Sequence, residues 1–90
     1  MGMTVIYREP YDDAELRIGW PSWDPTGQHG EKSIKYAYRR SDGRIARSSP
    51  ETPMRILLDL LVFADRCGEL ELNEEQLNSL RELLARHESR

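Results

Sequence analysis

The sequence predicts an α+β fold, an antiparallel β-meander of three to four strands followed by a two-helix hairpin packed on one face. All five prolines, both tryptophans, all four tyrosines and five of the six glycines lie before residue 54. The chain beyond is leucine-rich with helical spacing. Such a succession of β-rich and helical regions is typical of segregated layers. We expect a single small α+β domain over residues 1–90, β-rich over 3–48 and helical over 53–88.

Three segments carry strand patterns. Residues 4–7 are β-branched and aromatic, and we expect their strand to end before Pro10. Residues 14–20 and 33–39 alternate between apolar and polar positions. The alternation predicts one apolar face, which we expect to be the buried one, made by Leu16, Ile18, Trp20, Ile34, Tyr36 and Tyr38.

A turn is expected at residues 40–43, with Gly43 in the left-handed conformation. A four-residue loop would place Ile45 opposite Tyr38, whereas a two-residue turn would place it opposite Arg40. We prefer the four-residue loop, because it keeps apolar residues on one face and register follows the buried face.

Capping signals mark both helices. Thr52 is expected as the N-cap of the first helix, Pro53 as its first residue and Gly68 as its C-terminal signal. Asn73 and Gln76 have the spacing of a capping box, which predicts the start of the second helix.

The first helix is apolar around most of its circumference. A helix of this kind is buried on most sides, and 90 residues offer little protein to surround it. We therefore expect a homodimer whose interface includes Leu57, Leu58 and Leu61.

The net charge of −3 is unevenly distributed. Residues 31–47 carry six basic and two acidic side chains, whereas residues 1–30 carry two and five, and residues 48–90 carry five and nine. Such a basic segment between acidic ones predicts a partner surface. We expect an acidic protein partner to bind the basic residues Lys35, Arg39, Arg40, Arg44 and Arg47.

Nucleic acid is the alternative partner of this hairpin, because cations interleaved with tyrosines suit phosphate contact and base stacking. Two observations oppose it. Lysine and arginine also protect edge strands from aggregation, and the chain as a whole is acidic. The leading hypothesis is a small non-enzymatic protein-interaction or regulatory module. The alternative is a nucleic-acid-binding module using the basic hairpin Lys35–Arg47.

The loop over residues 21–30 holds Trp23 between two prolines. Packing of Trp23 back onto the sheet is the simpler interpretation. An exposed and rigidly held Trp23 would be an interface anchor, because tryptophan is enriched among the residues that dominate binding energy. We therefore include Trp23 in the expected partner-binding site.

No segment carries a catalytic, cofactor or metal signature. A phosphate-binding loop is not expected at residues 27–33, because Glu31 separates the second glycine from the lysine. The potential metal ligands His29, Cys67 and His87 lack the spacing of a site. We expect no enzymatic activity, no cofactor and no metal.

The chain has the features of a cytoplasmic protein that does not enter membranes. Its start lacks the basic and apolar regions of a signal peptide. The longest apolar stretch, residues 56–64, is interrupted by Asp59 and is shorter than a membrane span. The single Cys67 is compatible with a reducing compartment.

Overall fold

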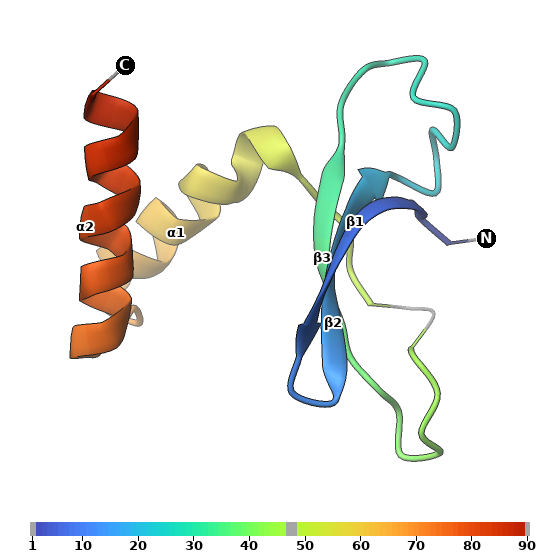
Figure 1. The fold of residues 1–90 in the computed structure, drawn as a ribbon, viewed down its shortest axis with the longest axis horizontal. Helices are drawn as coiled ribbons and strands as arrows, with labels where there is room; N and C mark the ends of the chain where they lie inside the picture. The colour runs from blue at the N-terminus through green and yellow to red at the C-terminus, as the bar shows by residue number, and fades with distance from the viewer. Residues whose placement is uncertain (1, 47–48, 90) are drawn as a thin grey trace. The chain divides into compact units, whose positions relative to one another are not determined.

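The computed structural model describes residues 2–46 and 49–89 and confirms the α+β class. A four-stranded antiparallel sheet with its strands in chain order is followed by two helices (Figure 1). The strands are β1 (Thr4–Tyr11), β2 (Ala14–Trp20), β3 (Ser33–Ala37) and β4 (Thr52–Pro53). A 3-10 turn (Met54–Ile56) leads into α1 (Leu57–Arg66), and α2 is Glu74–Glu88.

The chain divides into two compact units, one up to Leu58 and one from Asp59 onward. The first contains the whole sheet, and the second contains most of α1 and all of α2. Whether the two form a single domain, with the helices packed on the sheet, stays a prediction.

Strand β1 is longer than the sequence pattern predicts and passes through Pro10 to Tyr11. It is an edge strand, since the sheet order begins with β1. An edge strand tolerates proline because only one of its sides has to supply ladder hydrogen bonds. Tyr11 pairs with Ala14 across a two-residue turn in which Asp12 has a φ of 53°.

The expected start of the first helix is wrong. Thr52 and Pro53 pair with Ile34 and Ser33 as β4, and the α-helix begins only at Leu57. Pro53 has a ψ of 137°, which is extended backbone. The following residue continues the ladder, because its amide donates to the Lys32 carbonyl. A partner strand within reach therefore outweighed the local capping signal.

The turn at residues 40–43 is confirmed, and Gly43 has a φ of 84°. The register differs from both alternatives, since Ile45 pairs with Arg39. The Arg40 amide donates to the Arg44 carbonyl over 2.7 Å, which leaves a three-residue loop. Such loops combine a tight turn with a left-handed residue at their end, and Gly43 takes that position.

The apolar face of the alternating strands is not the covered one. Ser33, Lys35 and Ala37 are buried, whereas Tyr36 between them is 49% exposed and Ile34 is half-buried. We call the side of Leu16, Ile34 and Tyr36 the open face of the sheet. The buried apolar residues are small or near the N-terminus: Met3, Ala14, Pro21, Ala37 and Ala46. Small side chains let chain segments approach closely. The alternation alone did not reveal which face of the sheet these segments would cover.

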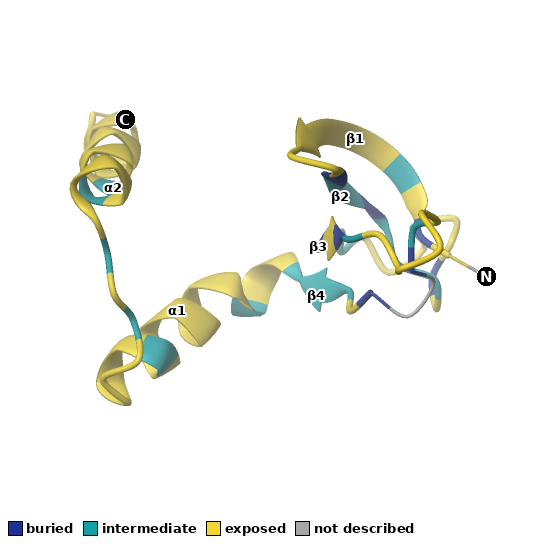
Figure 2. Ribbon diagram, turned by 90° about the horizontal axis from the view of Figure 1, so that it is seen from below, coloured by how far each residue is buried: buried dark blue, intermediate teal, exposed yellow. Residues whose placement is uncertain are grey.

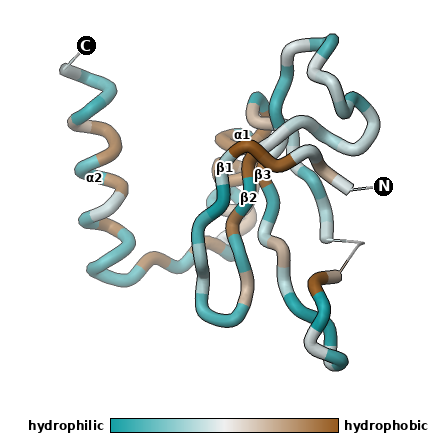
Figure 3. Tube along the Cα trace, turned by 45° about the vertical axis from the view of Figure 1, so that its right-hand side comes forward, coloured by the Kyte–Doolittle hydropathy of each residue, from teal (hydrophilic) through white to brown (hydrophobic). Residues whose placement is uncertain are grey.

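The predicted C-terminal signal of the first helix and the predicted N-terminal signal of the second are confirmed. The C-terminal glycine, Gly68, has a φ of 73°, and Asn73 and Gln76 form the capping box at the start of α2. No residue of α1 or α2, all of which the structure describes, is buried (Figure 2). Hydrophobic and hydrophilic positions alternate along α2 as in an amphipathic helix (Figure 3).

Candidate functional site

The loop from residue 21 to residue 32 is fixed by the carboxylate of Asp24. This side chain is only 4% exposed, and its two oxygens accept hydrogen bonds from the amides of Gln28 and His29, each at 3.0 Å. The Pro21 carbonyl accepts from the Asp24 amide, and the amide of Ser22 donates to the side chain of Glu51 over 2.8 Å. The loop is long but has a defined conformation, because its turns are hydrogen-bonded to a buried group.

Trp20 supports this loop from the end of β2. Its ring lies against Gly27, where a Cβ atom would come within 2.6 Å of it, and Gly27 has a φ of 71°. The Lys32 ammonium lies 4.5 Å from the centre of the same ring, in cation–π geometry. The expectation of a buried Trp20 is confirmed only in part, since the residue is half-buried.

Trp23, in contrast, is 61% exposed. Its nearest aromatic neighbour is His29, with ring centres 6.1 Å apart. The simpler interpretation, in which Trp23 packs back onto the sheet, is therefore wrong. The ordered loop holds a large apolar ring in solvent.

The predicted hairpin Lys35–Arg47 includes the end of β3 and one residue that the structure does not describe, so the basic hairpin is from here on residues 38–46. It exposes the arginines expected at its turn. The Arg39 guanidinium donates to the carbonyls of Asp13 and Gly43. The Arg40 guanidinium pairs with the Asp42 carboxylate at 2.6 Å, and that carboxylate also accepts from the Arg44 amide. Two of the three arginines are thus held by local contacts while remaining accessible.

Two other residues predicted to bind the acidic partner, Lys35 and Arg47, are not among these exposed arginines. Lys35 is 8% exposed and lies on the strand side opposite Tyr36, so it does not fit an exposed basic surface. Arg47 lies outside the described residues. The alternation along the strand predicts that Lys35 lies on the side of the sheet opposite Tyr36. It does not predict that this side is the covered one.

The Trp23 loop and the basic hairpin do not come together. The loop leads into β3 at Ser33 and the hairpin follows β3 after Ala37, so they lie at opposite ends of that strand (Figure 1). Five residues of strand separate the two ends by roughly 16 Å. One partner site that combines the two stays a prediction, and it would require a partner that spans the length of β3.

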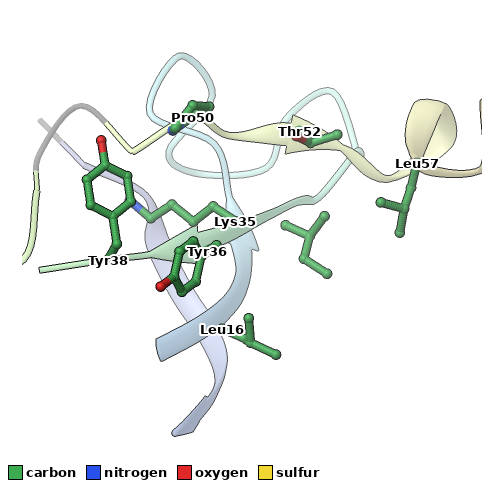
Figure 4. Close-up of a pocket in the computed structure, with 8 residues that line it drawn as sticks. Leu16, Lys35, Tyr36, Tyr38, Pro50, Thr52 and Leu57 are labelled. Carbon is green, nitrogen blue, oxygen red and sulfur yellow. The ribbon is translucent and has the colours of Figure 1, made fainter. Parts of the chain in front are cut away.

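A hollow of about 390 Å³ lies on the open face (Figure 4). It is lined by Leu16, Ile34 and Tyr36 of the open face, by Lys35 of the same strand β3, and by Tyr38, Pro50, Thr52 and Leu57. The Tyr36 ring contacts Tyr11 edge to face, with centres 5.8 Å apart, and Tyr38 at 5.9 Å. Sequence reasoning missed this site because it assigned the alternating tyrosines to the core. The same alternation was the signal that could have found it.

The residues expected at a dimer interface are exposed at the start of α1. Leu57, Leu58 and Leu61 are 42%, 67% and 37% exposed. Further exposed apolar side chains of α1 surround them: Leu60, Val62 and Phe63. Large apolar side chains are thus accessible from Leu57 to Phe63.

One ion pair changes the acidity of its carboxyl group. The side-chain hydrogen bond from Arg17 lowers the pKa of Glu15, aided by the positive charges of Arg17, Arg8 and Arg39 and opposed by partial burial. Both residues of this pair belong to β2.

Two further findings concern the described residues alone. Among residues 2–46 and 49–89, no three histidine, cysteine, aspartate or glutamate side chains gather as ligands for a metal ion. Within the same ranges, neither helix combines the length and the apolar character needed to cross a bilayer.

Comparison with protein-family models, with curated proteins and with solved structures finds no match for this chain.

Proposed function

We propose that this chain is a small, non-enzymatic protein-interaction module that acts in the cytoplasm as a homodimer. The observation that carries the proposal is the exposed ring of Trp23 on a loop fixed by the buried Asp24. A prearranged aromatic side chain loses little conformational entropy on binding, so most of its buried area contributes to affinity. Tryptophan is among the residues that most often dominate interface energies.

Self-association accounts for the apolar surface of α1. Leu57, Leu58 and Leu61 are exposed on a helix without a buried residue. Burying one such side chain completely contributes about 1.5–3 kcal/mol. Three half-exposed leucines on each of two copies therefore supply several kcal/mol toward a dimer, on the order of what association costs.

An acidic protein surface is the partner that the hairpin would attract. Arg39, Arg40 and Arg44 remain exposed at one end of β3. Exposed charges of this kind accelerate encounter and orient a partner, while the aromatic anchor supplies affinity. Because the hairpin and Trp23 lie at opposite ends of β3, a partner would have to span the strand or use one end only.

Nucleic acid remains the alternative, with less support. Arg39 and Arg40 already donate to protein acceptors, and Lys35 is buried. Tyr36 lies on the strand side opposite Lys35, so stacking and phosphate contact would not occur on one surface. A nucleic-acid complex would weaken steeply with salt in proportion to the phosphates it neutralises.

The partner site can be tested by recovering the tagged full-length protein from its cells with bound proteins. Trp23→Ala should remove a specific partner at any ionic strength. Tyr7→Ala is the matched control, since Tyr7 is equally exposed on β1. A partner retained by Trp23→Ala, or lost equally with Tyr7→Ala, would refute the role of the Trp23 loop.

Self-association can be measured separately by sedimentation. The wild type should be a dimer at micromolar concentration, and Leu58→Glu should be a monomer with an unchanged circular dichroism spectrum. A wild-type protein that sediments as a monomer at high micromolar concentration would rule out the homodimer.

A further inference from the structure

The open face of the sheet and helix α1 are two apolar surfaces of the same chain that complement each other. The hollow on the open face is lined by aliphatic and aromatic side chains, among them Leu16, Ile34 and Tyr36. Helix α1 exposes apolar side chains around most of its surface, including Leu58 and Val62. An apolar helix laid in an apolar groove is a common way in which proteins recognise one another.

Their dimensions agree. The ten residues of α1 span about 15 Å, and the five residues of β3 that cross the open face span roughly 16 Å. One α1 helix is therefore long enough to cover the hollow along β3.

Their charges agree as well. The three described arginines of the basic hairpin, Arg39, Arg40 and Arg44, follow β3 next to the tyrosines of the open face. Residues 59–76, which include most of α1 and the start of α2, carry six acidic side chains and one basic. An acidic helical segment docked on the open face would place opposite charges near one another, which favours this pairing over one between two acidic helices.

The connection into α1 favours a second copy as the source of the helix. Strand β4 ends at Pro53, and the 3-10 turn Met54–Ile56 is the only chain between it and Leu57. Leu57 itself lines the hollow. A helix that starts at the rim of a groove, with no loop before it, has little chain with which to reverse direction and fill that groove.

We infer that α1 of one copy docks in the hollow of the open face of a second copy, and that the exchange is reciprocal. This inference rests on the proposed self-association and specifies its geometry. A reciprocal contact of this kind closes with two-fold symmetry and yields a dimer rather than a filament.

Disulfide trapping between two full-length variants tests the inference. Both carry Cys67→Ser, one carries Tyr36→Cys on the open face, and the other carries Val62→Cys on α1. The two variants are mixed at equal concentrations and oxidised. The disulfide between position 36 of one variant and position 62 of the other should form several-fold more than either homodisulfide. A disulfide needs Cα atoms about 4.4–6.8 Å apart, and the docked helix would bring these two positions together. Ser79→Cys on α2 replaces Val62→Cys in the control and should give no excess of heterodisulfide.

Three results would overturn it. A dominant Val62–Val62 disulfide would mean that the helices pair with each other, which leaves the proposed homodimer intact. In a third variant that combines Tyr36→Cys and Val62→Cys with Cys67→Ser in one chain, an intrachain disulfide at high dilution would mean that the chain's own helix covers the open face. If the disulfide between positions 36 and 62 and the disulfide between two copies of position 62 both fail to form, while the wild type sediments as a dimer, the interface lies elsewhere.

If the Tyr36→Cys variant does not fold, as judged by circular dichroism, Thr52→Cys at the rim of the hollow replaces it with the same expected outcomes.

Discussion

The two ends of strand β3 carry connections that are built differently. At the Ser33 end, the loop over residues 21–32 is organised around the buried carboxylate of Asp24 and the ring of Trp20. At the Ala37 end, the basic hairpin is held by exposed contacts of arginine side chains and of Asp42. The aspartate that organises the first connection is buried, whereas the aspartate and arginines that contact one another in the second are exposed.

The difference determines what each connection can contribute to binding. Buried hydrogen bonds to a charged group are strong, so the loop can hold Trp23 in one place. Exposed ion pairs contribute little, and water competes for them. The loop is therefore suited to present an aromatic anchor, and the hairpin is suited to steer a partner by charge. Two predictions compare the two ends and two concern the hairpin alone, from the largest expected effect to the smallest.

The first compares the two aspartates that accept backbone hydrogen bonds. Asp24→Ala should lower the free energy of unfolding by about 3 kcal/mol, because two amides lose a buried charged acceptor. Asp42→Ala at the hairpin should lower it by only about 1 kcal/mol, because Asp42 is exposed. Urea denaturation measures both, and equal losses would show that Asp24 does not fix the loop.

The second compares two glycines with positive φ. Gly27→Ala should destabilise the protein by about 2 kcal/mol, because its Cβ would meet the Trp20 ring in addition to the backbone strain. Gly43→Ala should cost about 1 kcal/mol, because nothing lies within 4 Å of its Cβ position. Near-ultraviolet circular dichroism should change for Gly27→Ala alone, since only that variant displaces a tryptophan.

The third concerns the hairpin turn by itself. Gly43→Val should lower the free energy of unfolding by roughly 1 kcal/mol or more, since β-branched residues avoid the φ of 84° that Gly43 takes. Thermal unfolding at fixed pH would detect this loss. An unchanged melting temperature would mean that the turn rearranges without strain.

The fourth concerns the ion pair between Arg40 and Asp42. Arg40→Met should change the free energy of unfolding by no more than about 0.5 kcal/mol, because the guanidinium is largely exposed. The change should be smaller still at 1 M salt. A loss above 1 kcal/mol would show that the hairpin is more firmly held than its exposed contacts indicate.

Local signals in the sequence predicted those features whose causes are local. The β-rich and helical regions, the turn at residues 40–43 and the caps at Gly68 and Asn73 follow from backbone preferences of a few neighbouring residues. The exposure of Trp23 does not follow from such local signals, because it depends on how Asp24 fixes the conformation of the loop.

The sequence by itself determined that this protein has a β-rich region with one apolar alternation, then two helices with defined ends, and a basic segment between acidic ones. Only the tertiary structure decided that Thr52 and Pro53 extend the sheet, that Lys35 is on the covered side and Tyr36 on the open one. The physical reason is that a strand pattern of period two defines two faces without saying which will be covered. That choice depends on contacts between residues far apart in the chain, and here it left the larger apolar side chains exposed.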